Sequence, residues 1–253
     1  MNLKTLNRFQ ASGAHLLASG GVALLSAALV FLLWYPGSLA YASGVASIFL
    51  MVLGVDVTLG PLITLIIFNP KKKELKFDLL VVALVQLAAL FYGLHTVFVA
   101  RPVYLVFNTD RFDVVYANDL SREDLNKAGA DNRNLSWFGP QTVAARLPDD
   151  AKARNAILFS AISGGADVQG MPQYYVPYTE LQSVAAQRAQ PLTALHDLNP
   201  DKTLGIDVLI KKYESQKIDA GFVPLKAKVN DLTVVLDKKT GTVLEMVDFR
   251  PWK

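Results

Sequence analysis

One carboxylate stands inside a long apolar segment of the chain. The stretch Leu53–Leu62 reads LGVDVTLGPL and places Asp56 four and five residues before Gly60 and Pro61. Pro61 has no N–H, so it should free the carbonyl one turn earlier and bend the helix. Gly60 removes a side chain at the bend and shares a helix face with Asp56, because the two are four residues apart. The pattern predicts a carboxylate, an open carbonyl and bare backbone within two turns.

Asp56 does not prevent this segment from entering a membrane. An aspartate at the centre of a transmembrane helix costs about 2.5–3.5 kcal/mol, whereas each Leu, Ile, Phe or Val returns about 0.3–0.6 kcal/mol. Residues 45–68 contain fifteen residues of these four types, which offset the charge. An ionisable residue inside a span is a functional hypothesis that requires a named partner.

Three interpretations of Asp56 stay open. In the first, the carboxyl is protonated and bonds to Tyr92 or to a backbone carbonyl, and it only holds helices together. Tyr92 is the candidate partner because a rise of 1.5 Å per residue puts it at nearly the depth of Asp56. In the second, Asp56 grips a transmembrane helix of another protein. In the third it serves proton or ion translocation, for which a single embedded acid is a poor basis.

A second group of candidate residues lies in the segment Met171–Tyr178, MPQYYVPY, which places three tyrosines among two prolines. This segment is either a rigid loop packed on a domain core or a protein-binding surface, where tyrosines concentrate. In the second case Tyr174, Tyr175 and Tyr178 are the contact residues.

The sequence contains few side chains that suit a catalytic site or a metal site. The sequence has no cysteine, which excludes disulfides, thiolate zinc sites and a thiol nucleophile. His196 is the one histidine after residue 100, so a metal site or a hydrolytic triad would lack donors. We therefore expect no catalytic residue, no metal and no cofactor.

These candidate residues require a membrane anchor and a separate module to position them. Apolar stretches of about 20 residues or more, long enough to cross a bilayer, occur at about 16–35, 39–68 and 79–100. A cleavable signal peptide ending at Ala40-Tyr41-Ala42 is disfavoured, because the first stretch is too long and a second follows at once. We predict an anchor over 1–101 with three transmembrane helices.

Positive charges predict the orientation of this anchor. Lys4 and Arg8 precede the first span, and residues 71–76 place four lysines between the second and third. Basic segments stay in the cytoplasm and touch anionic lipid. The C-terminal part is then expected outside, in the periplasm of a Gram-negative cell. Charges after residue 100 balance, so no basic surface for nucleic acid is expected.

Residues 102–253 are predicted to form an α+β domain. Strands are expected at 101–108 and 110–119, and a hairpin is expected around 238–241. Helices are expected after Ser121 and over 149–162, 179–189 and 205–216. The order of the strands stays open.

Several of these segments together resemble a known family. HLLASGGVALLSAALVFLLWYPGSL, GVDVTLGPLITLIIFNPKKKELKFDL and VQLAALFYGLHTV resemble the membrane part of the type IV pilin accessory proteins of the TfpX/TfpZ type. GGADVQGMPQYYVPY and the terminal DFRPW resemble the external part of that family. The family has no established active site, so only its motif positions transfer: Gly54, Asp56, Gly60, Pro61, Arg250, Pro251 and Trp252.

The resemblance implies a bacterial inner-membrane protein that aids the assembly or disassembly of type IV pili or the stability of the pilin. Its expected partners are the major pilin and other pilus-assembly proteins of the inner membrane. We hypothesise that the second span, through Asp56, Gly60 and Pro61 with Tyr92 nearby, holds the pilin's membrane helix while the three tyrosines contact its external part. Two alternatives stay open, a membrane-anchored sensor of a periplasmic ligand and an enzyme acting on the envelope.

Overall fold

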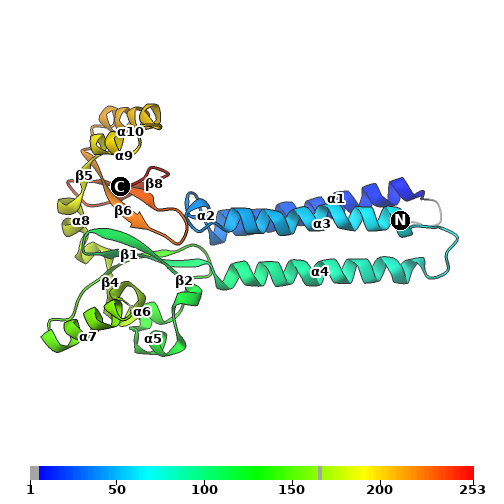
Figure 1. The fold of residues 1–253 in the computed structure, drawn as a ribbon, viewed down its shortest axis with the longest axis horizontal. Helices are drawn as coiled ribbons and strands as arrows, with labels where there is room; N and C mark the ends of the chain where they lie inside the picture. Colours follow the sequence, from blue (N-terminus) through cyan, green and yellow to red (C-terminus); the bar gives the residue numbers. More distant parts are fainter. Residues whose placement is uncertain (1–5, 165–166) are drawn as a thin grey trace. The chain divides into compact units, whose positions relative to one another are not determined.

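The computed structural model describes residues 6–164 and 167–253, and the chain divides into two compact units. The first unit consists of the chain before Trp34 together with Val45–Val99, and it is helical (Figure 1). The second unit consists of Trp34–Gly44 and Ala100–Lys253, and it is built on a sheet. The fold class is confirmed, since apolar helices are followed by a mixed helix and sheet unit.

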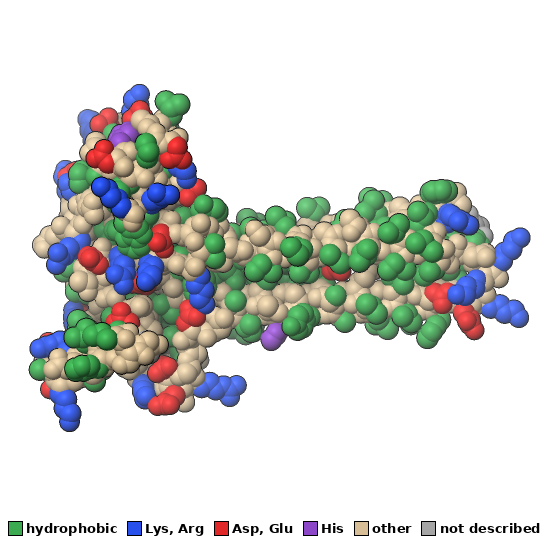
Figure 2. All heavy atoms as spheres, viewed as in Figure 1, with side chains coloured by type: hydrophobic (Ala, Val, Ile, Leu, Met, Phe, Trp, Pro, Cys, Tyr) green, Lys and Arg blue, Asp and Glu red, His purple; other side chains and the backbone are tan. Residues whose placement is uncertain are grey.

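The first unit holds three long helices, α1 (Arg8–Ala28), α3 (Val45–Ile67) and α4 (Leu75–Val99). A short π-helical stretch, η2 (Leu29–Trp34), continues α1. All three are long and apolar enough to cross a membrane, and Figure 2 shows hydrophobic side chains along their surfaces. α4 begins four residues earlier than predicted, at Leu75.

α1 begins two turns before the start predicted from the apolar pattern, at Arg8 instead of about residue 16. Asn7 caps this helix. Its Oδ1 accepts a hydrogen bond from Gln10 N (2.8 Å), and Gln10 Oε1 accepts one from Asn7 N (3.0 Å). The reciprocal pair satisfies two of the N–H groups that open a helix, so the polar residues before the apolar stretch are helical too. Lys4 lies outside the described residues.

The second predicted span, 39–68, was too long, because the chain turns at Gly44. The short helix α2 (Leu39–Ala42) ends just before it, and Gly44 takes a φ of +68°, a value that favours glycine. A Cβ at Gly44 would lie 2.8 Å from Val229 Cγ2. α3 therefore starts afresh at Val45, and α2 belongs to the second unit.

The second unit is one mixed sheet with strand order β4-β3-β1-β2-β6-β7-β8, and β5 pairs with β6. The β1/β3 and β2/β6 pairs are parallel and the others are antiparallel. The strands are β1 (Pro102–Asn108), β2 (Arg111–Tyr116), β3 (Gln141–Ala145), β4 (Tyr175–Pro177), β5 (Gln190–Pro191), β6 (Ala220–Lys226), β7 (Leu232–Asp237) and β8 (Val243–Val247).

Helices and single turns connect these strands. The α-helices are α5 (Arg122–Lys127), α6 (Ala130–Arg133), α7 (Ala151–Ile162), α8 (Gln182–Arg188), α9 (Leu195–Leu198) and α10 (Thr203–Ser215). The 3-10 turns are η3 (Ala117–Asp119), η4 (Val168–Gly170), η5 (Pro172–Tyr174), η6 (Tyr178–Glu180) and η7 (Leu192–Ala194).

Neighbouring residues of a strand point to opposite faces of the sheet. Hydrophobic side chains cover both faces of this sheet. One face carries a core that includes Phe107, Val114, Val223 and Val234, and α2 and α8 pack into it. The opposite face carries two separate cores. The first joins β1 and β2 to α7, and the second joins β6 and β7 to α9 and α10.

The expected elements of this unit are largely present. The two predicted strands are β1 and β2, and the predicted hairpin is β7 and β8. Ser121 caps α5 as expected, with its side chain accepting a hydrogen bond from Asp124 N. The helix predicted over 179–189 is only α8, because Tyr178–Glu180 forms a 3-10 turn. Strands β3, β4, β5 and β6 were not predicted.

Gly241 makes the turn of the β7–β8 hairpin, and this position tests the fold. Its φ is +74°, and a Cβ would lie 2.0 Å from the main-chain oxygen of Gln182. We expect Gly241→Ala to lower the free energy of unfolding by at least about 1–2 kcal/mol, the cost of the left-handed backbone alone. Denaturant unfolding of the full chain in detergent micelles checks this.

Gly129→Ala is the matched control. Its φ is −59°, and nothing lies within 4 Å of a Cβ placed there. If the two variants unfold at the same denaturant concentration, the role given to Gly241 is wrong.

Candidate functional site

Polar side chains of α1 reach across to α3 near Pro61. Ser12 Oγ donates a hydrogen bond to Pro61 O (2.8 Å), and His15 Nδ1 lies 2.6 Å from Thr64 Oγ1. Such bonds between helices satisfy polar groups that lipid cannot. α3 remains one helix across Pro61, so the proline is accommodated within the helix packing.

Gln86 of α4 fills the space that Gly60 leaves on α3. Its Nε2 donates to the main-chain oxygen of Asp56 (3.0 Å). A Cβ on Gly60 would lie 2.1 Å from the same Nε2. The sequence predicted bare backbone at Gly60, and the structure assigns that surface to the side-chain amide of a neighbouring helix.

A cavity of about 190 Å³ lies among the three helices of the first unit. It has room for several water molecules or an inserted side chain. Most of its lining is apolar, and His15, Asp56 and Gln86 are the titratable or amide side chains in it. The full lining is His15, Ala18, Ser19, Val22, Ala23, Leu53, Asp56, Ala83, Gln86, Leu87 and Leu90.

The Asp56 side chain is half-buried at this cavity. Within residues 6–164 and 167–253, no group forms a hydrogen bond or an ion pair with its carboxylate. Gln86 engages the main-chain oxygen of this residue and leaves its side chain untouched. The structure thus leaves a carboxylate without a partner beside a cavity at membrane depth.

Tyr92, the partner considered from depth alone, is not brought to Asp56. Its side chain is 76% exposed, and it does not line the cavity. Tyr92 follows Gln86 by six residues, which at 3.6 residues per turn rotates it by roughly 120° from the cavity face. Counting residues predicts depth but not the direction in which a side chain points. Gly54 lies on open surface, with nothing within 4 Å of a Cβ.

His15 and Gln86 were missed as cavity residues by the sequence reasoning. For Gln86 the signal was present, because it is an isolated polar side chain in an apolar span, as Asp56 is; His15 stands just before the first apolar stretch. What the sequence lacked was the pairing of α1 and α4 with α3, which depends on tertiary contacts.

The tyrosine segment packs on the core of the second unit. Tyr175 and Tyr178 are 7% and 9% exposed, and Tyr178 lies against Phe107 and Phe112. The Tyr178 hydroxyl donates to Gly241 O (2.7 Å), and that of Tyr175 donates to Gln169 O. Burial raises the pKa of both phenols, that of Tyr178 to about 12, which keeps them as donors. This burial argues against the contact-surface hypothesis for these two residues, and Tyr174 is half-buried beside them.

The motif Arg250-Pro251-Trp252 fastens the end of the chain to the second unit. Asn199 Nδ2 donates to Arg250 O (3.0 Å), and Asn199 Oδ1 accepts from Arg250 N (2.7 Å). Trp252 Nε1 donates to Asp231 Oδ2 (2.9 Å), and Pro251 is buried. These main-chain and indole bonds make the motif structural. The Arg250 side chain is exposed beside a cavity of about 490 Å³.

Metal ligation finds no support in the part of the chain that the structure describes. No group of three or more His, Cys, Asp or Glu side chains there could hold an ion. His196 bonds instead to Asp207 Oδ1 (3.0 Å) and to the carbonyl of Thr193 (3.0 Å).

The Gly60–Gln86 contact yields a prediction for the first unit. Gly60→Ala should displace the Gln86 amide and lose its hydrogen bond, at a cost of about 1 kcal/mol. Because Gln86→Ala removes the same bond, the double variant should be no less stable than Gln86→Ala alone. Thermal unfolding of the four proteins in one detergent measures this coupling. Fully additive losses would show that Gly60 serves another contact.

Comparison with known proteins identifies the family to which this chain is similar. Residues 4–44 match the family model described as fimbrial assembly protein FimB. The fimbrial assembly protein of Dichelobacter nodosus serogroup I is 32% identical over 231 residues, 90% of each chain. The serogroup E1 protein of that organism is 31% identical over the same share.

A third relative covers part of the chain. The Dichelobacter nodosus protein of serogroups C1 and C2 is 38% identical over 119 residues, 46% of this chain and 91% of its own. No solved structure matches. The resemblance to a type IV pilus accessory family is confirmed by these matches, two of which cover 90% of this chain. The chain belongs to the fimbrial assembly protein family.

Proposed function

We propose that this protein acts in type IV pilus biogenesis by binding the major pilin within the membrane, with Asp56 as the contact group. Its relatives are named fimbrial assembly proteins, which supports a role in assembling fimbriae. The observation that carries the pilin contact is the carboxylate without a partner among the described residues, at a cavity between apolar helices. A polar group at membrane depth is costly and is by default functional.

Helix packing does not account for this carboxylate. α1 is joined to α3 by Ser12 and His15, and α4 is joined to α3 by Gln86. Each of these bonds uses a main-chain oxygen or a hydroxyl of α3. The Asp56 side chain is left for a group outside the three helices. A pilin helix that carries a hydroxyl, an amide or a positive charge would supply the missing donor, and the low dielectric would strengthen the contact.

No specific observation favours the other interpretations of the chain. Translocation of protons or ions would require a series of titratable groups across the bilayer, and Asp56 is the one acid within residues 45–68. A ligand sensor and an envelope enzyme would both act through a site in the second unit, and the names of the relatives point to neither activity. We retain the assembly role.

The proposed orientation places the N-terminus and the α3–α4 link in the cytoplasm and the second unit in the periplasm. Figure 2 shows Lys and Arg gathered at the end of the helices where α3 meets α4, as cytoplasmic segments require. Because the chain has no cysteine, single-cysteine variants report location without background. We expect Ser121→Cys, and not Lys73→Cys, to react with an impermeant maleimide in cells with a permeable outer membrane. If Lys73→Cys were labelled and Ser121→Cys were not, the proposed orientation would be wrong.

Site-specific photocrosslinking tests the pilin contact. A photo-reactive residue at Leu59 or Ile63, partly exposed on α3 beside Gly60, should capture the major pilin in cells. Asp56→Asn should reduce this capture about tenfold or more, since a hydrogen bond to a charged group contributes about 1.5–3 kcal/mol.

Thr58→Val is the control for this experiment, because among the described residues the Thr58 hydroxyl bonds only within its own helix, to Gly54 O (2.7 Å) and Val55 O (3.3 Å). Undiminished capture by Asp56→Asn would remove the carboxylate from the proposal. Capture of nothing but the protein's own chain would overturn pilin binding at this cavity.

A further inference from the structure

One edge of the sheet in the second unit receives the chain from α4. β1 begins at Pro102, three residues after α4 ends at Val99, and Tyr116 at the end of β2 pairs with Pro102. Arg101 is fixed at this edge, because its main-chain oxygen accepts a hydrogen bond from Ala117 N (2.9 Å). We call the edge where β1 begins and β2 ends the junction edge.

The chain also leaves the second unit for α3 at the junction edge. Ser43 Oγ donates a hydrogen bond to Tyr116 Oη (3.1 Å), and Ala42 O accepts one from Val229 N (3.1 Å). Val45, the first residue of α3, follows Ser43 by two positions. Consecutive Cα atoms are about 3.8 Å apart, so links of two or three residues tie the junction edge to the start of α3 and the end of α4.

The segment before β3 lies at the same edge. β3 runs parallel to β1, with Gln141 opposite Tyr104, so both strands begin on the same side of the sheet. The buried Arg101 guanidinium donates to Ser136 O from Nε (3.0 Å) and Nη2 (2.8 Å). Ser136 Oγ in turn accepts from Phe138 N (3.2 Å) and donates to Phe138 O (3.0 Å). These bonds form a turn that is held by a residue two positions beyond α4.

Two aromatic side chains of this turn are exposed. Trp137 is 67% exposed and Phe138 is 64% exposed. Leu135, just before them, packs against the core that joins β1 and β2 to α7. The turn therefore has an inner apolar residue that anchors it and two outer aromatic residues that the core does not use. Neighbouring large apolar groups on a surface indicate an interaction site.

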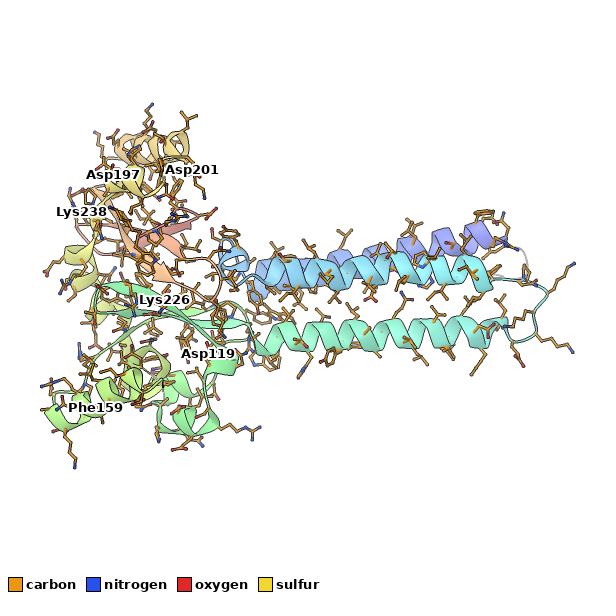
Figure 3. The ribbon with its side chains drawn as sticks, viewed as in Figure 1. Asp119, Phe159, Asp197, Asp201, Lys226 and Lys238 are labelled. Atoms are coloured by element: carbon orange, nitrogen blue, oxygen red, sulfur yellow. The ribbon has the colours of Figure 1, made fainter. Side chains whose placement is uncertain are left out.

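A second exposed apolar pair lies further along the junction edge. β6 runs parallel to β2 and so ends at this edge, where Val229 is 61% exposed and Tyr41, beside Ala42, is 48% exposed. Figure 3 labels Asp119 and Lys226, which follow β2 and end β6. The strand order β3-β1-β2-β6 separates the two pairs by three strand spacings, roughly 15 Å.

The positions of these residues favour lipid as the occupant. α4 has 25 residues, which span about 37 Å at 1.5 Å per residue, more than the roughly 30 Å of hydrocarbon in a bilayer. Its end therefore reaches the head-group layer, where tryptophan and tyrosine are enriched. Trp34 and Tyr35, which follow the first apolar span, are 9% and 1% exposed, so they do not supply this aromatic contact.

We propose that the junction edge binds the surface of the bilayer, with Trp137 and Phe138 inserted among the lipid head groups and with Tyr41 and Val229 as a second point of contact. Two contacts on one edge, beside the links to α3 and α4, hold the second unit against the membrane. The contact uses apolar and aromatic groups, so it forms on neutral phosphatidylcholine as well as on anionic lipid.

Quenching by brominated lipid tests the first contact. The full chain is placed in phosphatidylcholine nanodiscs that carry bromine on the acyl chains near the head groups, with unbrominated nanodiscs as the reference. The control is Trp137→Phe/Phe159→Trp, which moves the indole to an equally exposed position (67%) on α7 (Figure 3). We expect bromine to remove about one-third more of the emission from the wild type, because Trp137 is one of three tryptophans.

Spin labelling tests the second contact and leaves Trp137 in place, so it decides the matter even if the relocated tryptophan disturbs folding. The chain has no cysteine, and a nitroxide is attached to Val229→Cys or to the control Val208→Cys. Val208, on α10, is 68% exposed, close to the 61% of Val229. We expect the ratio of collisions with oxygen to collisions with a water-soluble nickel chelate to be several-fold higher for Val229→Cys.

Three results would overturn the proposal. They are equal loss of emission from the two tryptophan variants, equal collision ratios for the two labels, and shielding of the Val229→Cys label from both reagents, as contact with a second copy of the chain would give. The junction edge lies wholly in the second unit. Its test therefore stands or falls separately from pilin capture at Leu59 or Ile63.

Discussion

The carbonyl oxygen of Ala42 accepts two hydrogen bonds, from Val229 N and Asn230 N (3.1 Å each). These bonds join the short segment between the first two long helices to the turn between β6 and β7. Leu39 and Ala42 are fully buried in the core that the strands form. The sheet unit is therefore completed by chain from both sides of α3 and α4. A fragment that starts after α4 would leave this core open and should be unstable.

The first unit meets a different constraint, the absence of water in a bilayer. Its polar side chains are used mainly to engage main-chain oxygens, as Ser12 does at Pro61 and Gln86 does at Asp56. Gly60 permits this because it leaves the helix backbone accessible. The Gly60-Pro61 pair thus serves packing between helices. Asp56 differs from these groups, since its main-chain oxygen is bonded to Gln86 while its carboxylate has no hydrogen bond to any residue that the structure describes.

Sequence reasoning succeeds where a local pattern decides the structure. Apolar length predicts the three spans, and Gly241, in its left-handed conformation, marks the hairpin turn of β7 and β8. It fails where partners are remote in the sequence. Helical phase depends on which helices pack together, so Tyr92, chosen for its depth alone, is 76% exposed and does not line the cavity. Gln86, whose bond to Asp56 spans 30 positions, is missed for the same reason.

The second unit shows the same division. β1 and β2 read as strands because they are rich in β-branched and aromatic residues. β3 and β4 are short and lie among glycines and prolines, so their pairing is visible only once β1 provides an edge. Tyrosines among prolines are ambiguous in sequence between an exposed and a packed loop. The Tyr178 hydroxyl donates a hydrogen bond to Gly241 O, 63 residues away in the sequence, and this contact holds the loop against the core.

The hydrogen bonds that join the segment around α2 to the turn between β6 and β7 have a consequence for biosynthesis. Asn230 Nδ2 donates to Tyr41 O (3.1 Å) across 189 positions of the chain, and closing so long a loop costs entropy. Insertion of α3 and α4 as a helical hairpin shortens the flexible chain between these partners before they meet. The sheet can then close only after β6, β7 and β8 have been synthesised. A chain arrested before that point would display an incomplete sheet.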